Sequence, residues 1–316
     1  MALTDKLQNI GNAIRSKTGK TDLLTLDEMV TEIGNIETGG GSGGDVSEYF
    51  NTEITTNTTG AQGILHSVVK KLPNLIIGSN VTSMANAFAY YQGDVIPSIT
   101  FLSNKVTNFS SCFAFCSNIT TIPQIDTSNG TNFSVMFSSC SKLTEIPLIN
   151  TSKGTNFNNM FSGCYSLATI PEIDTSNGTN FSNMFYFASS SKLKTIPKLN
   201  MSKATNISSL IYSSTGGTQS YLAELENLGG FENLGEAYST TSNANYSYYT
   251  LDILSNVRSE VYNKITHDSL MNVINNLYDI GAKGCNTQKL QLGSLNLSKL
   301  TADEIAIATN KGWTVS

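Results

Sequence analysis

The stretch Leu143-Thr144-Glu145-Ile146-Pro147-Leu148-Ile149, followed by Thr155-Asn156-Phe157-Asn158-Asn159-Met160-Phe161-Ser162-Gly163-Cys164, decides the fold of this chain. Both motifs recur from about residue 73 to residue 211, and the prolines mark the period. The intervals between successive prolines are 24, 26, 24, 24 and 26 residues. The prolines are Pro73, Pro97, Pro123, Pro147, Pro171 and Pro197. A fixed period with occasional two-residue insertions predicts copies that stack and bury a shared core.

The first half of each copy reads Leu-x-x-Ile-Pro-x-Ile. Because proline removes a ladder N–H, the pattern predicts a short strand of about four residues that ends near the proline. The segments 126–130 and 174–178 read Asp-Thr-Ser-Asn-Gly. These residue types favour a turn in which side chains bond the local backbone.

The second half of each copy places large apolar residues at helical spacing. Phe133, Met136, Phe137 and Cys140 stand at i, i+3, i+4 and i+7, which predicts one face of a helical turn packed in the core. An asparagine precedes this segment in five copies, and we expect its side chain to bond the backbone of neighbouring copies. The asparagines are Asn108, Asn132, Asn156, Asn180 and Asn206.

The cysteines follow the repeat and do not form a metal-binding pattern. Cys116, Cys140 and Cys164 recur every 24 residues, whereas zinc sites use closely spaced pairs. We expect buried free thiols, with a disulfide between neighbouring copies as the alternative. Calcium at the Asx-rich turns is disfavoured because no bidentate Glu follows them. The sequence therefore predicts no metal and no cofactor.

Four regions are expected along the chain. Residues 1–38 form a helical attachment or oligomerisation module, because Leu3, Leu7, Ile10 and Ile14 lie on one helical face. Residues 39–48 are a flexible Gly/Ser linker. Residues 49–220 form the repeat solenoid, and residues 221–316 form β-α repeats that cap it, since the open end of a stack needs a cover.

The cap region carries its own local signals. A strand is expected near Tyr249–Ile253, and a helix carrying Leu270, Val273 and Leu277 follows it. A second strand is expected around residues 289–292. The segment 301–304 reads Thr-Ala-Asp-Glu, which fits a capping box at the start of a last helix. A final strand is expected over residues 313–315.

Composition excludes several classes of partner. The net charge is −5 and no basic run occurs, which argues against nucleic acid. No apolar stretch approaches the roughly 20 residues of a membrane helix, so we expect no membrane insertion. The N-terminus lacks the apolar core of a signal peptide, so synthesis in the cytoplasm is expected. Charged residues are only 14% of the chain, so its polar surface comes mainly from Ser, Thr and Asn.

The repeat itself resembles a known class. The segment Ile170–Ser176, continuing to Met184 and Phe185, is similar to the bacterial surface-protein class of leucine-rich repeats. The predicted fold class is therefore α/β: a leucine-rich-repeat solenoid of short parallel strands and helical turns. A helical N-terminal module and a β-α C-terminal cap flank it.

Both ends of the chain resemble tail proteins of phages that infect Gram-positive bacteria. Residues 13–20 with 26–29 resemble the start of such proteins, and residues 300–313 resemble their ends. The resemblance implies a receptor-binding protein of the phage tail fibre or tip, located in the virion tail. The implied partners are other tail proteins, bound through the N-terminus, and a bacterial receptor. That receptor is a polysaccharide, a teichoic acid or a surface-layer protein. A homo-oligomer is expected, as is usual for fibres.

Three alternatives remain beside this reading. A bacterial surface adhesin uses the same repeats, and a structural tail component touches only virion proteins. A depolymerising tail enzyme is the third. The chain has two histidines, His66 and His267, and no G-x-S-x-G, H-E-x-x-H or P-loop motif, so no catalytic residue is predicted.

Receptor binding is expected at exposed positions between the core columns. One set lies beside the prolines, and a tyrosine group near the cap is a second candidate, because tyrosines make good contacts with proteins and sugars. The first set is Thr121, Gln124, Glu145, Leu148, Thr169, Glu172, Thr195 and Lys198; the second is Tyr238, Tyr246, Tyr248 and Tyr249.

Overall fold

The structure, a computed structural model, describes residues 52–54, 75–96, 98–187, 191–213, 225–236, 250–252 and 264–316. It is a mixed α/β chain in which short strands pair in parallel and few helices occur among these residues. The strands are β1 Thr52–Ile54, β2 Leu75–Ile77, β3 Ile99–Phe101, β4 Phe185–Phe187, β5 Thr195–Ile196, β6 Leu199–Asn200, β7 Ile211–Ser213, β8 Asn227–Leu228, β9 Phe231–Glu232, β10 Thr250–Asp252, β11 Gln288–Gln291 and β12 Trp313–Val315. The helices are α4 His267–Asn276, the 3-10 turn η3 Gly281–Lys283, α5 Ser294–Leu297 and α6 Ala302–Asn310.

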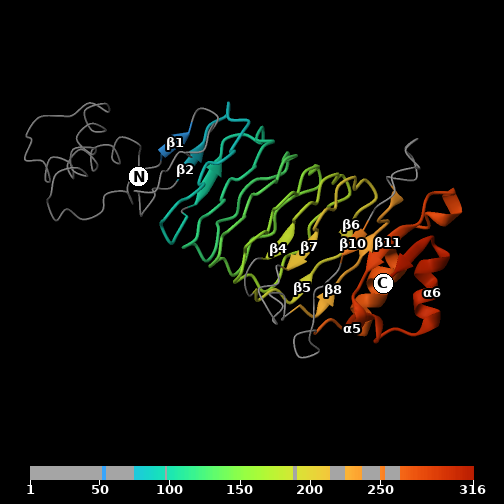
Figure 1. Cartoon of the computed structure of the whole chain (residues 1–316). Coiled ribbons are helices and arrows are strands. Elements are labelled where there is room, and N and C mark those ends of the chain that lie inside the picture. The colour runs from blue at the N-terminus through green and yellow to red at the C-terminus, as the bar shows by residue number, and fades with distance from the viewer. Residues whose placement is uncertain are drawn as a thin grey trace, which may run out of the picture. The chain divides into compact units, whose positions relative to one another are not determined.

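Successive copies of the repeat lie side by side in chain order (Figure 1). Parallel bridges join Ser83 to Asn108 and then each asparagine of the column to the next, as far as Asn206. Strand β2 pairs with β3 in the same sense, and β4 pairs with β7, each across one period of the sequence. The 24-residue period read from the sequence is therefore the spacing between neighbouring chain segments.

The segments with helical spacing are not helical, so this prediction is wrong. Residues 133–140 form a run of hydrogen-bonded turns. Within the run, the N–H of Met136 donates to the Phe133 carbonyl and that of Cys140 donates to the Phe137 carbonyl. The backbone enters the left-handed region at Val135 (φ 61°) and at Ser139 (φ 62°). An α-helix cannot pass through such residues, because every residue of a right-handed helix has a negative φ.

The N–H groups that a helix would use internally instead join the copies. Four of them, from Phe133, Val135, Phe137 and Ser139, donate to carbonyl groups of the next copy at 2.7–3.1 Å. The intervening N–H groups close the local turns. The same alternation recurs in the copies before and after, with every such bond directed toward the C-terminal neighbour. Each copy is thus held to the next by backbone bonds that an α-helix cannot make.

The strand predicted before each proline is absent from the central copies. Among the described residues, the one strand that ends directly before a proline is β5, two residues long, and it pairs with β8. In that pair the partner copy has Gly229 opposite Pro197, and the Gly229 N–H donates to the Ile196 carbonyl at 2.9 Å. Where prolines stack on prolines this donor is missing, which breaks the ladder.

The apolar columns form the core as predicted. Phe133, Met136, Phe137 and Cys140 are each 0% exposed, and the corresponding residues of the neighbouring copies are buried with them. Two ladders of near-parallel phenylalanine rings run across the copies. Ring centroids in one ladder are 5.3–5.8 Å apart, from Phe109 to Phe181. The other runs from Phe88 to Phe185, with centroids 5.1–5.9 Å apart.

The asparagine column works differently from the prediction. Its backbone makes the bridges between copies, whereas each side chain bonds its own copy. The Asn132 Oδ1 accepts from the Ser134 N–H at 3.1 Å, and the Asn156 Oδ1 accepts from the Asn158 N–H at 3.2 Å. A side chain this short favours the local turn two residues onward. The turns at Asp126 and Asp174 follow the same geometry, which confirms the local bonding predicted there.

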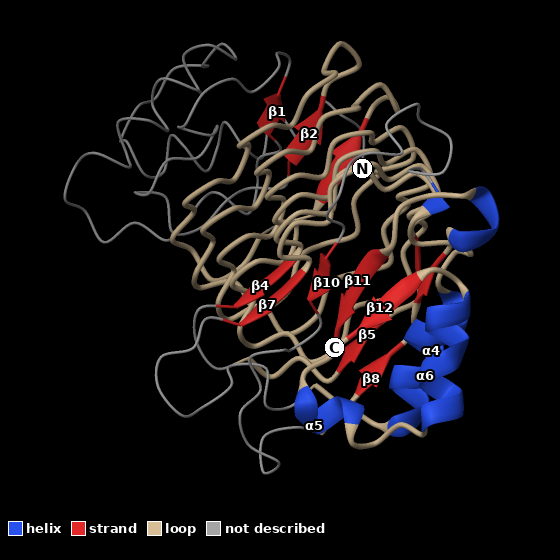
Figure 2. Cartoon of the chain, turned by 45° about the vertical axis from the view of Figure 1, so that its right-hand side comes forward, coloured by secondary structure: helices blue, strands red, loops and turns tan. Residues whose placement is uncertain are grey.

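The C-terminal elements match the sequence expectations closely. Strands β10, β11 and β12 form a parallel sheet in that order. Helix α4 packs on β8, β9 and α6, and α6 packs on β12, so the helices lie together beside the sheets (Figure 2). Helix α6 begins with the predicted capping box, in which Thr301 and Glu304 bond each other's backbone. The Trp313 side chain is buried and donates to the Tyr278 carbonyl at 3.0 Å.

The chain divides into two compact units, Met1–Thr52 and Glu53–Ser316. The expected helical module, the Gly/Ser linker and the boundary at residues 220–221 lie outside the described residues. None of the described helices has the length and apolar character needed to cross a membrane.

Candidate ligand-binding groove

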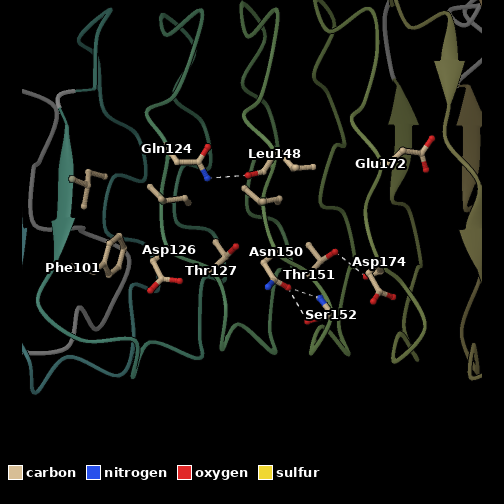
Figure 3. Close-up of a pocket in the computed structure, with 13 residues that line it drawn as sticks. Phe101, Gln124, Asp126, Thr127, Leu148, Asn150, Thr151, Ser152, Glu172 and Asp174 are labelled. Atoms are coloured by element: carbon tan, nitrogen blue, oxygen red, sulfur yellow. Dashed lines mark hydrogen bonds between the residues drawn. The ribbon is translucent and has the colours of Figure 1, made fainter.

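A groove of about 760 Å³ crosses neighbouring copies of the repeat on one face (Figure 3). We call it the central groove. Its walls combine apolar side chains with amides, hydroxyls and carboxylates, a mixture typical of ligand sites. It is lined by Ile99, Phe101, Gln124, Ile125, Asp126, Thr127, Leu148, Ile149, Asn150, Thr151, Ser152, Glu172 and Asp174.

Two rows of side chains face this groove, each with one member per copy. Gln124, Leu148 and Glu172 make the upper row in Figure 3. Asp126, Asn150 and Asp174 make the lower row, two residues further along each copy. The isoleucines between the rows, Ile125, Ile149 and Ile173, are buried. The alternation places one residue in the core and its neighbours in solvent, as in an extended chain.

The structure brings together three of the residues predicted for binding. Gln124, Leu148 and Glu172 all line the central groove, and Leu148 is 67% exposed. The Gln124 amide also donates to the Leu148 carbonyl of the next copy at 2.9 Å. This side-chain bond joins two copies beside Pro123 and Pro147, whose missing N–H groups interrupt the ladder.

The other predicted residues beside the prolines are placed elsewhere. Thr121, Glu145 and Thr169 are exposed but do not line the central groove. Thr195 is half-buried and lines a smaller hollow of about 370 Å³ together with Lys198 and Glu172. Lys198 is exposed there and forms an ion pair with Glu232 at 3.2 Å. The eight residues therefore divide between two hollows and the open surface.

The second predicted group lies outside the described residues. Tyr238, Tyr246, Tyr248 and Tyr249 all fall in the segment 237–249. Their proposed role in binding stays a prediction.

The central groove is acidic. Asp126, Glu172 and Asp174 line it, and its lining contains no Lys, Arg or His. Asp126 Oδ1 accepts from the Ser128 N–H at 3.0 Å, and Asp174 Oδ1 accepts from the Ser176 N–H at 2.9 Å. No described residue bonds the second oxygen of either carboxylate, and no cationic side chain in the lining offsets their charge.

One hydroxyl in the lining lacks a partner. Thr151 donates to the Asp174 carbonyl at 2.8 Å, and Thr175 donates to the Asn200 carbonyl at 3.0 Å, each across one copy. Thr127 occupies the same place one copy earlier and is 2% exposed. Its hydroxyl has no hydrogen-bond partner among the described residues. A buried unpaired hydroxyl is costly, which makes Thr127 an exception that invites explanation.

The chain segments that form the central groove match one family model. Residues 82–196, and again residues 107–224, match the family described as "Mycoplasma protein of unknown function, DUF285". The two matches start 25 residues apart, which is about one period, so the model fits the repeats in successive registers. No curated protein and no solved structure gives a significant match. The similarity concerns the repeats and does not reach either end of the chain.

The described residues contain no group of three His, Cys, Asp or Glu side chains placed to hold a metal ion. The cysteines Cys112, Cys116, Cys140 and Cys164 are buried free thiols, which confirms the prediction for this column. Burial raises the pKa of the Cys164 thiol to about 12, so it stays protonated at neutral pH.

Most residues of the central groove were not predicted from the sequence. Phe101 and the lower row were not among the predicted binding residues, although they line the groove beside Gln124, Leu148 and Glu172. The sequence did contain a signal for the lower row. Successive copies carry Asp126, Asn150 and Asp174 at the same position, so a charged residue alternates with a neutral one. The sequence predicts these residues to form turns, and their side-chain bonds to the local backbone confirm that role, but one oxygen of each carboxylate has no bond within the turn.

Proposed function

We propose that the repeats form a leucine-rich-repeat solenoid that presents the central groove to a bacterial surface. The chain then acts as the receptor-binding protein of a phage tail and attaches the virion to a Gram-positive cell. The observation that carries this proposal is the central groove itself. It brings together Gln124, Leu148 and Glu172, three residues that the sequence predicts for binding and that differ between the copies.

The solenoid is supported by bonds that repeat at every copy. Asparagine bridges, alternate N–H bonds and two aromatic ladders all connect a copy to its immediate neighbours. A copy of 24 residues has too small a core to stand alone, so stacking is what stabilises it. Such a stack presents equivalent side chains at a regular spacing, which suits recognition of a repeating polymer.

The lining of the groove supports binding. Leu148 stands 67% exposed among polar side chains, and apolar groups combined with a few polar ones are typical of ligand sites. The lining contains no histidine, cysteine or lysine, so its carboxylates are the groups through which the depolymerising enzyme, the alternative function, would act.

The remaining assignments rest on the resemblance of the chain ends to phage tail proteins. We propose that the N-terminal module binds other tail proteins and that the chain assembles as a homo-oligomer in the virion tail. The receptor is a polysaccharide, a teichoic acid or a surface-layer protein of the host.

One observation favours a second candidate, a bacterial surface adhesin. The family model that matches the repeats is described from Mycoplasma, a bacterium, and not from a phage. Antibodies against the chain separate the two candidates. Labelling of tail tips on virions supports the phage protein, and labelling confined to bacterial cells supports the adhesin.

The test of binding is adsorption of the full-length, fluorescently labelled chain to a panel of Gram-positive cells. We expect Leu148→Asn to weaken adsorption to the strains that bind by roughly tenfold, because a central apolar contact is lost. Val95→Asn is the control, since Val95 is 65% exposed but does not line the central groove. Equal adsorption of Leu148→Asn and the unchanged chain contradicts the proposal. Release of soluble sugar from the cells instead supports the depolymerising enzyme.

A further inference from the structure

We infer that the central groove binds a glycan that carries free amino groups. This inference rests on the proposed function, because it names the class of receptor that the same groove accepts. Among the receptor types considered, it selects an amine-bearing polysaccharide over polyanionic polymers and over protein. Three features of the groove lead to this class.

The first feature is charge. Asp126, Glu172 and Asp174 line the groove, and no cationic side chain of the lining balances them. Two lysines outside the lining are engaged with other side chains: Lys153, next to the groove-lining Ser152, donates to the Asn129 amide oxygen, and Lys198 is paired with Glu232 at 3.2 Å. A phosphate-rich polymer placed here would be repelled by these carboxylates, which would weaken its binding. Ammonium groups would find three carboxylates.

The second feature is the supply of neutral hydrogen-bonding groups beside apolar ones. Asn150 and Ser152 offer an amide and a hydroxyl, while Phe101 and Leu148 offer apolar surface. Sugar rings need both kinds of contact, because their hydroxyls are polar and their C–H faces are not. The unpaired Thr127 hydroxyl lies in the same lining, and a ligand oxygen seated against it would supply the missing partner.

The third feature is spacing. Asp126 and Asp174 hold the same place in copies that are two periods apart, with Asn150 between them. Neighbouring parallel segments are about 4.8 Å apart, so the two carboxylates are separated by about 10 Å along the stack. A linear polymer that runs across the copies and carries an amine on its sugars can reach both carboxylates at once. A compact ligand cannot.

The test compares two probes that share one backbone. The first is a glucosamine hexamer, measured at a mildly acidic pH at which its amines are protonated, and the second is the N-acetylated hexamer, which has no charge. Calorimetry with the full-length chain measures both affinities. We expect the glucosamine hexamer to bind more tightly, by roughly three- to tenfold, and to lose that advantage in high salt.

The chain supplies its own matched variant. Asn150 already occupies the lower row and makes the same cap bond, with the Ser152 N–H donating to its Oδ1 at 3.0 Å. The double variant Asp126→Asn with Asp174→Asn therefore removes two charges and retains the turns. We expect it to lose most of the preference for the glucosamine hexamer, with Glu172 as the one lining carboxylate that remains. Asp94→Asn is the control, because Asp94 is an exposed aspartate of the repeats that does not line the groove.

Three outcomes overturn the inference. They are no detectable binding of the glucosamine hexamer, an affinity unchanged by the double variant, and tighter binding of the N-acetylated hexamer. The proposed function is judged separately, by adsorption to cells. If Leu148→Asn abolishes adsorption while the double variant adsorbs normally and the glucosamine hexamer does not bind, the groove binds cells through another ligand class. If Leu148→Asn adsorbs normally, the proposed function fails as well.

Discussion

The Cys140 thiol donates a hydrogen bond to the carbonyl oxygen of Phe113 in the preceding copy, with an Sγ–O distance of 2.9 Å. Cys116 makes the same bond to Phe88, and Cys164 makes it to Phe137. The cysteine column therefore fills the core and also satisfies a carbonyl group of the neighbouring copy. A thiol is small, apolar and a weak donor, which fits both tasks.

We expect these thiols to resist alkylation in the folded protein. Burial raises the pKa of Cys112 and Cys140 well above the ordinary thiol value and that of Cys164 to about 12, and the thiolate is the reactive form. Cys285 is only half-buried and should react first with iodoacetamide at neutral pH. Peptide mass spectrometry measures the extent at each site, with guanidinium-unfolded protein as the control. Modification of Cys140 as fast as that of Cys285 would rule the prediction out.

Val135→Asn should stabilise the protein. Val135 has a φ of 61°, a region that a β-branched residue adopts only with strain. Asn159 and Asn183 hold the same place in the next two copies, with φ values of 54° and 55°. We expect a gain of about 1 kcal/mol in the free energy of unfolding, measured by urea denaturation. Val95→Asn is the control, because Val95 is an exposed valine without a left-handed backbone, and it should change the stability little.

Two threonines in equivalent places should respond differently to the same change. Thr151→Val removes a bond to the Asp174 carbonyl and should cost about 1 kcal/mol. Thr127→Val removes a buried hydroxyl that has no partner among the described residues, so it should be neutral or slightly stabilising. Thermal and urea unfolding of both variants measure the difference. Equal losses in the two variants would show that the Thr127 hydroxyl is satisfied in solution.

The pKa of His267 should lie above its ordinary value of 6.5. Its Nε2 is 2.8 Å from Glu304 Oε1, and this hydrogen bond is the main cause, with a weaker one from Asp268. Since the folded pKa is raised, the contact between α4 and α6 contributes fully below pH 6.5 and is lost as the pH rises through the folded pKa. NMR titration measures the pKa, and Glu304→Gln should lower it while keeping the α6 cap. His66→Gln assigns the signal, because the chain has two histidines.

The burial of the repeats could be predicted because it depends only on which residues recur. Phe157, Met160, Phe161 and Cys164 are 0% exposed, whatever backbone carries them. The backbone itself was predicted wrongly, because spacing of i, i+3, i+4 and i+7 also arises from consecutive turns. The distinguishing signal is the residue type at the left-handed positions. Asparagine, serine or glycine stands at most of them, as at Gly163.

The C-terminal elements were predictable for another reason. Helix α6 carries a capping box that involves only Thr301 and Glu304, and a local signal of this kind does not depend on distant contacts. The groove, in contrast, depends on contacts between residues that are distant in the sequence. Exposure of Leu148 follows from the alternation along one copy, but the hollow between the two rows depends on the relative positions of four copies. The period of the sequence indicates that the copies lie side by side, but it does not indicate how deep the groove between the two rows is.

The direction of the bonds between copies has a consequence for how this chain can change. In the turn segments every N–H that bonds another copy points toward the C-terminal neighbour, and at the last copy the Asn233 N–H donates to the Asn276 carbonyl at the end of α4. In these segments, the C-terminal end of the stack has N–H groups that need acceptors, and the N-terminal end has carbonyl groups that need donors. The carbonyl end of α4 supplies an acceptor at the C-terminal end. Each interior copy presents donors on one side and acceptors on the other, so interior copies are interchangeable. Whole periods can therefore be gained or lost by recombination while the C-terminal cap is retained. The length of the repeat stack can evolve in steps of one period, and an added copy must have the same orientation as its neighbours.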